Sequence, residues 1–320
     1  MAERAAMSCN ITGRWNGRSY RIIRSLGIGA NGKVYLVGEN DRQYAIKISR
    51  DAAGVALEYR LLRQLQAQQQ NGVENSVQGS RLGPFVYDLD DFPGDGGKPV
   101  HFYTMEYIPG IPITSYVREK GRSEIGRLFQ QLLNYLRQLH RLGYAFGDLK
   151  AENVLVNPLS GELRLVDFGG ATRFGEGIRQ YTEWYDRAYW NAGSRRADIQ
   201  YDLFAAGMLM LRLLLPEAQR IDVGRGGFRK IRRLLQQSPE MQPWQGVLER
   251  AWRGNYRDAS EMLRAVSFVK SSGWKTHQGI PGRVHKQVNR TEADWDWSHW
   301  VAVGSAVLCL AMILRVFMVR

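Results

Sequence analysis

The stretch Gly147-Asp-Leu-Lys-Ala-Glu-Asn-Val-Leu-Val156, followed after a turn by Leu165-Val-Asp-Phe-Gly169, decides the fold of this 320-residue chain. In both halves a short hydrophobic run adjoins polar residues, so neighbouring loops present Asp148, Asn153 and Asp167. Carboxylate and amide oxygens suit Mg²⁺, which binds through one or two carboxylates together with substrate phosphates. Each of these residues alone is equally consistent with an ordinary turn, so the interpretation depends on the rest of the chain.

A glycine pattern near the N-terminus, Gly27-Ile-Gly29-Ala-Asn-Gly32, is the second motif. The same spacing opens dinucleotide-binding helices, but here the strand-like run 33–37 follows, which places the glycines at a hairpin tip. Residues without Cβ let backbone N–H groups approach phosphate oxygens. Lys47 lies on the next predicted strand, at a spacing that brings it to this hairpin. The pattern predicts a phosphate-binding hairpin beside a lysine.

Apolar runs separated by turn residues predict a small antiparallel sheet in the first third of the chain. One helix, at 55–65, interrupts the strands, and the Gln-, Asn- and Gly-rich stretch 66–80 is typical of a surface loop. Together these elements predict an α+β lobe. The predicted strands are 20–23, 33–37, 44–48, 85–87 and 101–105.

After Pro109-Gly110 the periodicity becomes helical. Ser123 is placed to cap a helix whose apolar stripe runs over 125–139 and which ends at Gly143. The run 201–215 is apolar nearly all round, which is typical of a helix buried at the centre of a larger lobe. Shorter helices are predicted at 229–237, 244–252 and 258–270.

Taken together, these motifs resemble the eukaryotic-type protein kinases over residues 19–269. The glycine hairpin, the strand lysine, the Gly-Asp loop and the Asp-Phe-Gly run occur in the order of that family. The resemblance implies a two-lobed α+β fold, with a small sheet lobe at 19–108 and a larger, mainly helical lobe at 109–269. It also implies an ATP- and Mg²⁺-dependent serine/threonine protein kinase.

The resemblance implies a nucleotide site between the two lobes. The glycines would cover the ATP phosphates, and Lys47 would bind the α- and β-phosphates while it pairs with an acid on the small-lobe helix. Glu58 is the best candidate for that acid, and Met105 is implied as the gatekeeper before a hinge whose backbone binds adenine. The implied ATP-binding residues are Gly27, Gly29, Gly32, Val34, Ala45, Lys47, Glu58, Met105, Glu106 and Ile108.

The resemblance also implies roles in the larger lobe. Asp148 would be the catalytic base and Lys150 the lysine typical of Ser/Thr-directed loops, with Asn153 and Asp167 as the metal ligands. A lysine, a metal and a carboxylate near the acceptor hydroxyl are the charges that phosphoryl transfer needs. The implied structural residues are Asp202, which would brace the catalytic loop, and Arg257, a late arginine.

Two motifs depart from the family. Its His-Arg-Asp is Phe146-Gly147-Asp148 here, and Arg187-Ala-Tyr-Trp-Asn191 stands where Ala-Pro-Glu is expected. The missing arginine is the usual partner of an activation-loop phosphate, so we expect activity not to depend on that switch. Two alternatives remain open: a pseudokinase scaffold that binds partners, and a small-molecule kinase, because glycine before the aspartate also occurs in atypical small kinases.

Composition narrows the class of protein. A formal net charge of +13 and 44 % hydrophobic residues indicate a globular chain with a sizeable core and a preference for anionic partners. Two cysteines, Cys9 and Cys309, form neither a disulfide framework nor a cysteine zinc site. We see no nucleic-acid module and expect no nucleic-acid partner. The basic cluster is typical of a solvated face, with anionic lipid or an acidic substrate as the minority interpretation. It contains Arg225, Arg229, Lys230, Arg232 and Arg233.

The end of the chain predicts a membrane anchor. The apolar run 301–314 resumes after Arg315, and a bilayer core of ~30 Å needs about 20 residues. Trp295, Trp297 and Trp300 precede the run, as at a membrane boundary. A buried core helix is the alternative.

The linker before this run carries basic residues and no acid over 271–290, so the positive-inside rule keeps the kinase domain cytosolic. The chain is thus expected to be single-pass, with membrane lipid as a partner and its protein substrates unknown. The predicted parts are an N-terminal tail (1–18), the kinase domain (19–269), a basic linker (270–294) and a C-terminal transmembrane helix (295–320).

Overall fold

The computed structural model describes residues 10–271, apart from Ala30, residues 72–82, Gln180 and residues 222–225. The described residues all belong to one compact unit. The predicted anchor 295–320, both cysteines and Arg225 lie outside the described residues. Among the residues that are described, no helix has the length and apolar character needed to cross a bilayer.

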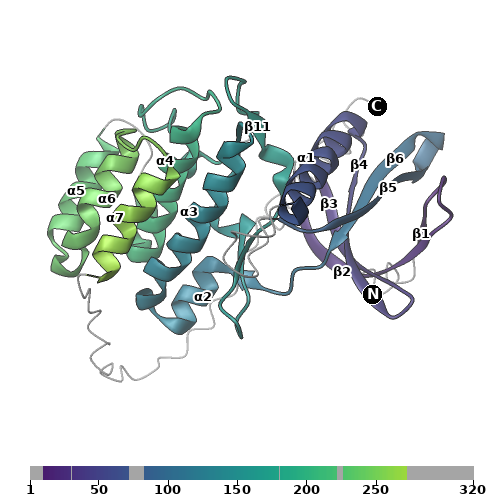
Figure 1. The fold of residues 1–320 in the computed structure, drawn as a ribbon, viewed down its shortest axis with the longest axis horizontal. Helices are drawn as coiled ribbons and strands as arrows, with labels where there is room; N and C mark the ends of the chain where they lie inside the picture. The colour runs from purple at the N-terminus through teal and green to yellow at the C-terminus, as the bar shows by residue number, and fades with distance from the viewer. Residues whose placement is uncertain (1–9, 30, 72–82, 180, 222–225, 272–320) are drawn as a thin grey trace, which may run out of the picture. The chain divides into compact units, whose positions relative to one another are not determined.

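The small lobe, residues 10–108, is built on an antiparallel sheet in the order β1-β2-β3-β4-β6-β5. Successive side chains of a strand point to opposite faces. On β4, Ala45 therefore joins the apolar cluster under helix α1 (Ala52–Asn71), while Tyr44 and Ile46 join a second cluster on the other face. Figure 1 shows α1 lying against the sheet. The strands are β1 (Asn10–Thr12), β2 (Ser19–Gly29), β3 (Gly32–Glu39), β4 (Arg42–Ser49), β5 (Val86–Pro93) and β6 (Pro99–Glu106).

Several elements of the small lobe extend beyond their predicted bounds, for example β2, which runs to Gly29. Strand β1 and the end of helix α1 lie where no such element was predicted. Strand β1 lies inside the stretch predicted as an N-terminal tail; it pairs with the start of β2 and buries Ile11. Three residues are too few to show an alternating pattern, so this strand could not be predicted from the sequence. Helix α1 continues to Asn71, through residues 66–71 of the predicted loop. Gln and Ala are good helix formers, so the glutamine-rich composition there did not end the helix.

The large lobe, residues 109–271, is mainly helical, and Figure 1 shows its helices gathered on the side away from the sheet. Helix α4 packs against α3, α6 and α7, and nearly all of its residues are buried, as its apolar sequence predicts. The Asp198 carboxylate caps α4 by accepting a hydrogen bond from the Tyr201 N–H at 2.8 Å. The helices are α2 (Ile113–Lys120), α3 (Ile125–Arg141), α4 (Ile199–Leu214), α5 (Gly227–Gln236), α6 (Gln242–Trp252) and α7 (Ala259–Ser271).

The cap predicted at Ser123 is wrong. A 3₁₀ turn, η3 (Arg122–Glu124), runs directly into α3, so the capping position falls at Glu124, whose side chain makes no capping bond. The backbone of Glu124 already has helical dihedral angles, and the chain enters α3 without the extended residue that a side-chain cap requires.

Short strands and turns of the large lobe position its polar loops. The loop 146–153 lies between β8 and β9 and ends in a 3₁₀ turn, η4 (Ala151–Asn153), and Asp167 follows β10. Strands β9 and β10 pair with Val154 opposite Leu165, so the first loop ends next to the point where the second begins. The short strands are β7 (Ile111–Pro112), β8 (Tyr144–Ala145), β9 (Val154–Val156), β10 (Leu163–Leu165) and β11 (Thr172–Arg173).

An ion pair joins the two lobes next to the segment that connects them. Arg164, on β10, is 8 % exposed, and its Nη2 lies 2.9 Å from Oε2 of Glu106, the last residue of β6. The same nitrogen donates to the Gly83 carbonyl at 2.7 Å. A guanidinium that bonds both a carboxylate and a backbone carbonyl fixes the large lobe to the end of the small-lobe sheet.

Arg164→Met is expected to lower the free energy of unfolding by about 1–3 kcal/mol, because it removes a buried charge-assisted bond from Glu106 and the donor from the Gly83 carbonyl. Urea unfolding of the full-length protein measures the change. Arg257→Met is the matched control: its side chain is 80 % exposed, and a change within about 0.5 kcal/mol is expected. Equal unfolding midpoints for the two variants would contradict the prediction.

Candidate active site

Lys47 lies at the centre of a charged site between the lobes. It sits on β4 and is 2 % exposed. Its Nζ lies 2.7 Å from Glu58 Oε2 on α1 and 2.7 Å from Asp167 Oδ1 of the large lobe. The structure thus brings together a lysine and two acids that lie far apart in the sequence, and Glu58 is the acid that Lys47 meets on the helix.

Burial and charge act against each other in this triad. Burial favours a lower pKa for Lys47, but the Glu58 and Asp167 carboxylates outweigh it, so that pKa is raised. Burial favours a higher pKa for Asp167, but the Lys47 ammonium outweighs it, so that pKa is lowered. For the almost fully buried Glu58, burial dominates and the pKa is raised in spite of Lys47. Lys47 and Asp167 are therefore held in their charged forms.

The residues implied as nucleotide contacts share one face of the small-lobe sheet. Val34 on β3 pairs with Lys47, and Ala45 on β4 pairs with Met105 on β6. Directly paired residues of antiparallel strands point to the same face, and residues two apart on one strand do so too. This face is the one that carries the Lys47 side chain. Ile108, half-buried, follows β6 in the connection to the large lobe.

The glycine hairpin joins β2 to β3. Gly27 pairs with Val34, and Gly29 pairs with Gly32. Gly32 has φ of +127°, and a Cβ there would overlap the Ile48 carbonyl oxygen on β4, so this position requires glycine. The hairpin therefore lies directly beside β4, the strand that carries Lys47.

Asp148 lies in the loop after β8 and is held by two neighbours. Lys150 Nζ lies 2.6 Å from Asp148 Oδ2, and the Asn153 amide nitrogen donates to the Asp148 carbonyl at 2.9 Å and to Oδ2 at 3.3 Å. Burial raises the pKa of Asp148, and the Lys150 ammonium only partly opposes it. The geometry leaves a buried but ionisable carboxylate beside a cation, which is suited to accept a proton.

The donor set of the site fits Mg²⁺. Within the described residues, Asp167 Oδ1 is taken by Lys47 and Gly169, whereas Oδ2 accepts no hydrogen bond. The Asn153 side chain uses its nitrogen on Asp148, so its Oδ1 remains for a ligand. No group of three His, Cys, Asp or Glu side chains in the described part of the chain could hold a metal. Two oxygen ligands suit an ion that keeps waters and shares substrate phosphates.

Asp202, fully buried on α4, braces the loop that carries Asp148. Its Oδ2 accepts from the Phe146 N–H at 2.7 Å and lies 2.8 Å from His140 Nε2, and its Oδ1 accepts from the Gly147 N–H at 3.0 Å. Sequence reasoning missed His140, because it lies on α3, outside the loop motif. An imidazole is thus present beside the loop, although Phe146 replaces the histidine of the motif.

The structure explains why phenylalanine and glycine fit at positions 146 and 147. The Phe146 ring packs edge-on against Phe168, which follows Asp167, with ring centroids 5.1 Å apart. Gly147 has φ of +78°, and a Cβ there would overlap the Gly170 carbonyl oxygen. The loop after Asp167 therefore lies too close for a side chain at position 147, and an arginine there would strain the backbone.

The segment after Asp167 is anchored by two ion pairs. The buried Arg187 guanidinium donates to both carboxylate oxygens of Asp198, at 2.9 and 2.7 Å. Arg195 donates to the fully buried Asp186 at 2.6 Å, and its guanidinium stacks on Tyr181 at 3.9 Å. These ion pairs between its own side chains and the start of α4 hold the segment in place.

Arg257 does not occupy the structural position that the resemblance implies. Its side chain is 80 % exposed, and its ion pair is with the adjacent Asp258 at 3.6 Å. Arg187 takes the buried bracing position, since it stands in the stretch that replaces Ala-Pro-Glu and pairs with the cap of α4. Of the basic cluster, Arg232 pairs with Glu249 at 3.3 Å, and Arg229, Lys230 and Arg233 are exposed, as on a solvated face.

The sequence of this chain is similar to those of known proteins. A Bacillus subtilis (strain 168) protein named Serine/threonine-protein kinase YabT is 36 % identical over 262 residues, which cover 79 % of this chain and 72 % of that protein. Human Ribosomal protein S6 kinase alpha-4 is 29 % identical over 187 residues, which cover 52 % of this chain and 22 % of that protein.

One comparison shows the fold of the chain, and another shows its family. A solved structure of vaccinia related kinase 3 matches with a TM-score of 0.61 at 13 % identity and covers 83 % of this chain and 91 % of that one, which shows the two-lobed fold. The family described as Protein kinase domain matches residues 20–243, more than half of the chain. The chain therefore belongs to the protein kinase family.

Proposed function

We propose that this protein is an active, ATP- and Mg²⁺-dependent serine/threonine protein kinase that works at a membrane. One observation carries the catalytic part: Lys47 lies 2.7 Å from both Glu58 and Asp167. A buried lysine held charged beside a carboxylate with a free oxygen is a site for a magnesium nucleotide. A scaffold that only binds partners has no need for this arrangement of buried charges, which favours an enzyme over a pseudokinase.

Asp167 and Asn153 are the residues that would hold Mg²⁺, and Lys47 is the cation for the nucleotide phosphates. Bound there, the metal neutralises negative charge on the phosphates. The hairpin around Gly27, Gly29 and Gly32 offers its backbone to the same phosphates. Ala45, Met105 and the backbone of residues 106–108 border the space for adenine, while the Glu106 side chain is turned to Arg164.

As the acceptor hydroxyl oxygen bonds to the γ-phosphorus of ATP, the bond from that phosphorus to the bridging oxygen of the β-phosphate breaks and ADP leaves, while Asp148 takes the proton of the hydroxyl. Lys150, 2.6 Å from Asp148, keeps that carboxylate oriented and offers positive charge beside the transferred group. Asp202 holds the loop backbone on both sides of the bond between Phe146 and Gly147. The relatives reported above are protein kinases, which favours a protein hydroxyl over a small molecule as acceptor.

The test incubates the full-length protein with ATP labelled in the γ-phosphate, Mg²⁺ and a serine-containing protein. Parallel reactions contain EDTA or the Asp167→Asn variant. We expect label in phosphoserine or phosphothreonine in the complete reaction alone. Equal labelling in all three reactions, or none in any of them, would count against the enzyme and in favour of the pseudokinase scaffold.

The pH profile of the reaction follows from the raised pKa of Asp148. Only the ionised carboxylate accepts a proton, so activity falls as the pH drops through that pKa, at a pH above the ordinary value of 3.8. Lys150 opposes the rise in the pKa of Asp148, so Lys150→Met is expected to move the acid limb of the kcat profile to higher pH. Lys150→Arg keeps the positive charge and is expected to leave the limb nearer to its wild-type position. An acid limb that is unchanged or moves to lower pH in Lys150→Met would refute the assignment of Asp148 as the proton acceptor.

The membrane part of the proposal is carried by the apolar run 301–319 with its preceding tryptophans. A tether raises the local concentration of membrane-bound substrates. Alkaline carbonate extraction of membranes tests it: the full-length chain is expected to stay in the membrane fraction, and a chain that ends at Asp294 to be released. Full release of the full-length chain would refute a spanning helix.

A further inference from the structure

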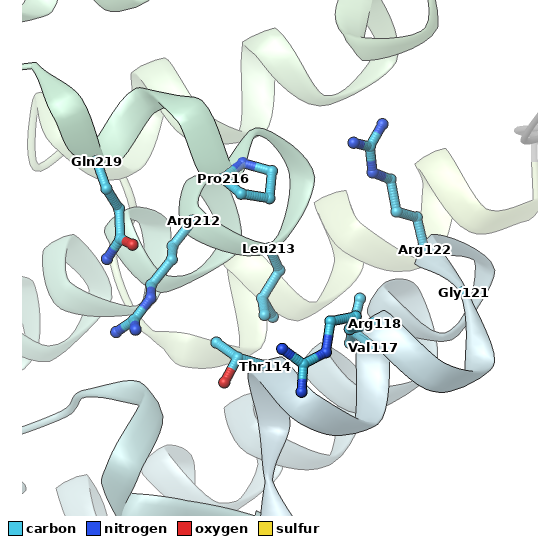
Figure 2. A pocket seen from close by; sticks show the side chains of 9 residues that line it. All are labelled: Thr114, Val117, Arg118, Gly121, Arg122, Arg212, Leu213, Pro216 and Gln219. Carbon is cyan, nitrogen blue, oxygen red and sulfur yellow. The ribbon is translucent and has the colours of Figure 1, made fainter. Parts of the chain in front are cut away.

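A pocket of about 540 Å³ opens in the large lobe beside the proposed catalytic loop. It lies between α2, the turn after α2, the end of α4 and the turn η7 (Pro216–Arg220). Figure 2 shows the Arg212 side chain extending from α4 and the Arg118 side chain from α2, with Thr114 between them in this view. The other polar residues that line it are Arg122 and Gln219.

The lining of this arginine pocket contains three guanidinium groups and no acid. The Arg212 side chain is constrained and only 21 % exposed. Its Nη1 bonds Tyr185 Oη at 2.7 Å and Glu152 Oε1 at 3.2 Å, while its Nε and Nη2 donate to no described residue. Arg118 is exposed and forms no ion pair within the described part of the chain. Within the described part of the chain, the Arg118 guanidinium and the Nε and Nη2 groups of Arg212 are therefore available to an external acceptor.

The pocket is linked to the catalytic loop by Arg212. Glu152, its partner, belongs to the turn η4 and stands between Lys150 and Asn153 in sequence. The other partner, Tyr185, comes from the segment after Asp167. Through the ion pair of Arg212 with Glu152 the pocket is next to the loop that carries Asp148, so it is within reach of residues that flank the acceptor hydroxyl in an extended substrate chain, which advances about 3.3 Å per residue.

We propose that the arginine pocket binds an acidic side chain of the protein substrate, a few residues from the hydroxyl that accepts phosphate. The inference rests on the proposed function, since it deepens it by naming a substrate class. Guanidinium groups bind carboxylates through paired N–H donors, and the half-buried position of Arg212 strengthens such a bond relative to one in open solvent. An apolar or basic flanking residue leaves the same donors unpaired, so the pocket discriminates by charge.

The test uses the full-length protein and a set of serine peptides that differ at one flanking position at a time. Each position carries Glu, its neutral isostere Gln, or Arg. At one or two positions Glu is expected to raise kcat/KM about tenfold over Gln, mainly through KM, as a charge-assisted contact does. In Arg118→Gln and Arg212→Gln the ratio of the Glu to the Gln peptide is expected to fall towards one. Arg229→Gln, an exposed arginine of α5, is the matched control and keeps the ratio.

Reversing the charge of a pocket arginine distinguishes the loss of a contact from misfolding of the protein. Arg118→Glu is expected to prefer the Arg peptide over the Glu peptide, which misfolding does not produce. A phosphoserine peptide at the same position tests whether a phosphoryl group replaces the carboxylate, and inorganic phosphate as competitor tests whether a free anion suffices. Competition by inorganic phosphate as strong as by the peptide would overturn the assignment to a substrate side chain.

Binding without catalysis distinguishes this inference from the proposed function. Fluorescence anisotropy follows a labelled Glu peptide whose serine is replaced by alanine, with wild type and with Arg118→Glu. Arginine-dependent binding without any phosphoryl transfer would refute the kinase activity and leave the pocket assigned. Normal transfer with equal kcat/KM for the Glu and Gln peptides at every position would refute the pocket and leave the kinase assigned.

Discussion

Asp167→Asn is expected to lower the rate of phosphoryl transfer by about 10²- to 10³-fold, the loss that follows removal of one group aimed at charge in the transition state. The Oδ1 atom of this carboxylate accepts from Lys47 and Gly169, and its Oδ2, which accepts no hydrogen bond from the described residues, is the anionic oxygen proposed for Mg²⁺. An asparagine is nearly the same size but carries no charge. The measurement is the initial rate with γ-labelled ATP at saturating Mg²⁺.

Asp258→Asn is the matched control, because it makes the same substitution at the start of α7. There Asp258 Oδ1 accepts from the Glu261 N–H at 2.8 Å, and asparagine caps a helix about as well as aspartate. Its rate is expected to equal that of wild type. A rate for Asp167→Asn within threefold of this control would remove Asp167 from the catalytic machinery and with it the main argument for an enzyme.

The charged site could be predicted from the sequence to the extent that its residues lie in compact motifs. Asp148, Asn153 and Asp167 stand in two loops whose flanking strands pair, so their proximity followed from local pattern. Glu58 was a choice among acids near one helix, and the 2.7 Å contact with Lys47 depends on how α1 packs on the sheet. That packing is a tertiary property that no local pattern contains.

Two residues that sequence reasoning missed act over long separations, and a third was misplaced because its motif is changed. His140 reaches Asp202 from α3, 62 positions away, and Arg164 reaches Glu106 across the lobes. Arg257 was assigned by its place in a motif, but the partner it needs is absent from the stretch after position 187, and Arg187 pairs with Asp198 instead. A changed motif shifts the ion pair to other residues, and only the packed chain shows which ones.

Asp202→Ala is expected to lower the free energy of unfolding by about 3–5 kcal/mol, as removal of one member of a buried charged network does. Asp202 is fully buried, and three donors converge on its carboxylate: the N–H groups of Phe146 and Gly147 and the His140 imidazole. Alanine accepts none of these bonds. Urea unfolding of the full-length protein, read by circular dichroism, measures the loss.

Asp202→Asn separates the loss of hydrogen bonds from the loss of packing. The asparagine side chain fills the same space but has a single acceptor oxygen, and its NH₂ group would face a backbone N–H that also donates. A cost of about 1–3 kcal/mol is expected, between those of wild type and alanine, from the unsatisfied donor. Activity is expected to fall in both variants even below the unfolding transition, because the two N–H groups held by Asp202 immediately precede Asp148. Wild-type stability in Asp202→Ala, or full activity in a folded Asp202→Asn, would show that the loop holds its shape without this carboxylate.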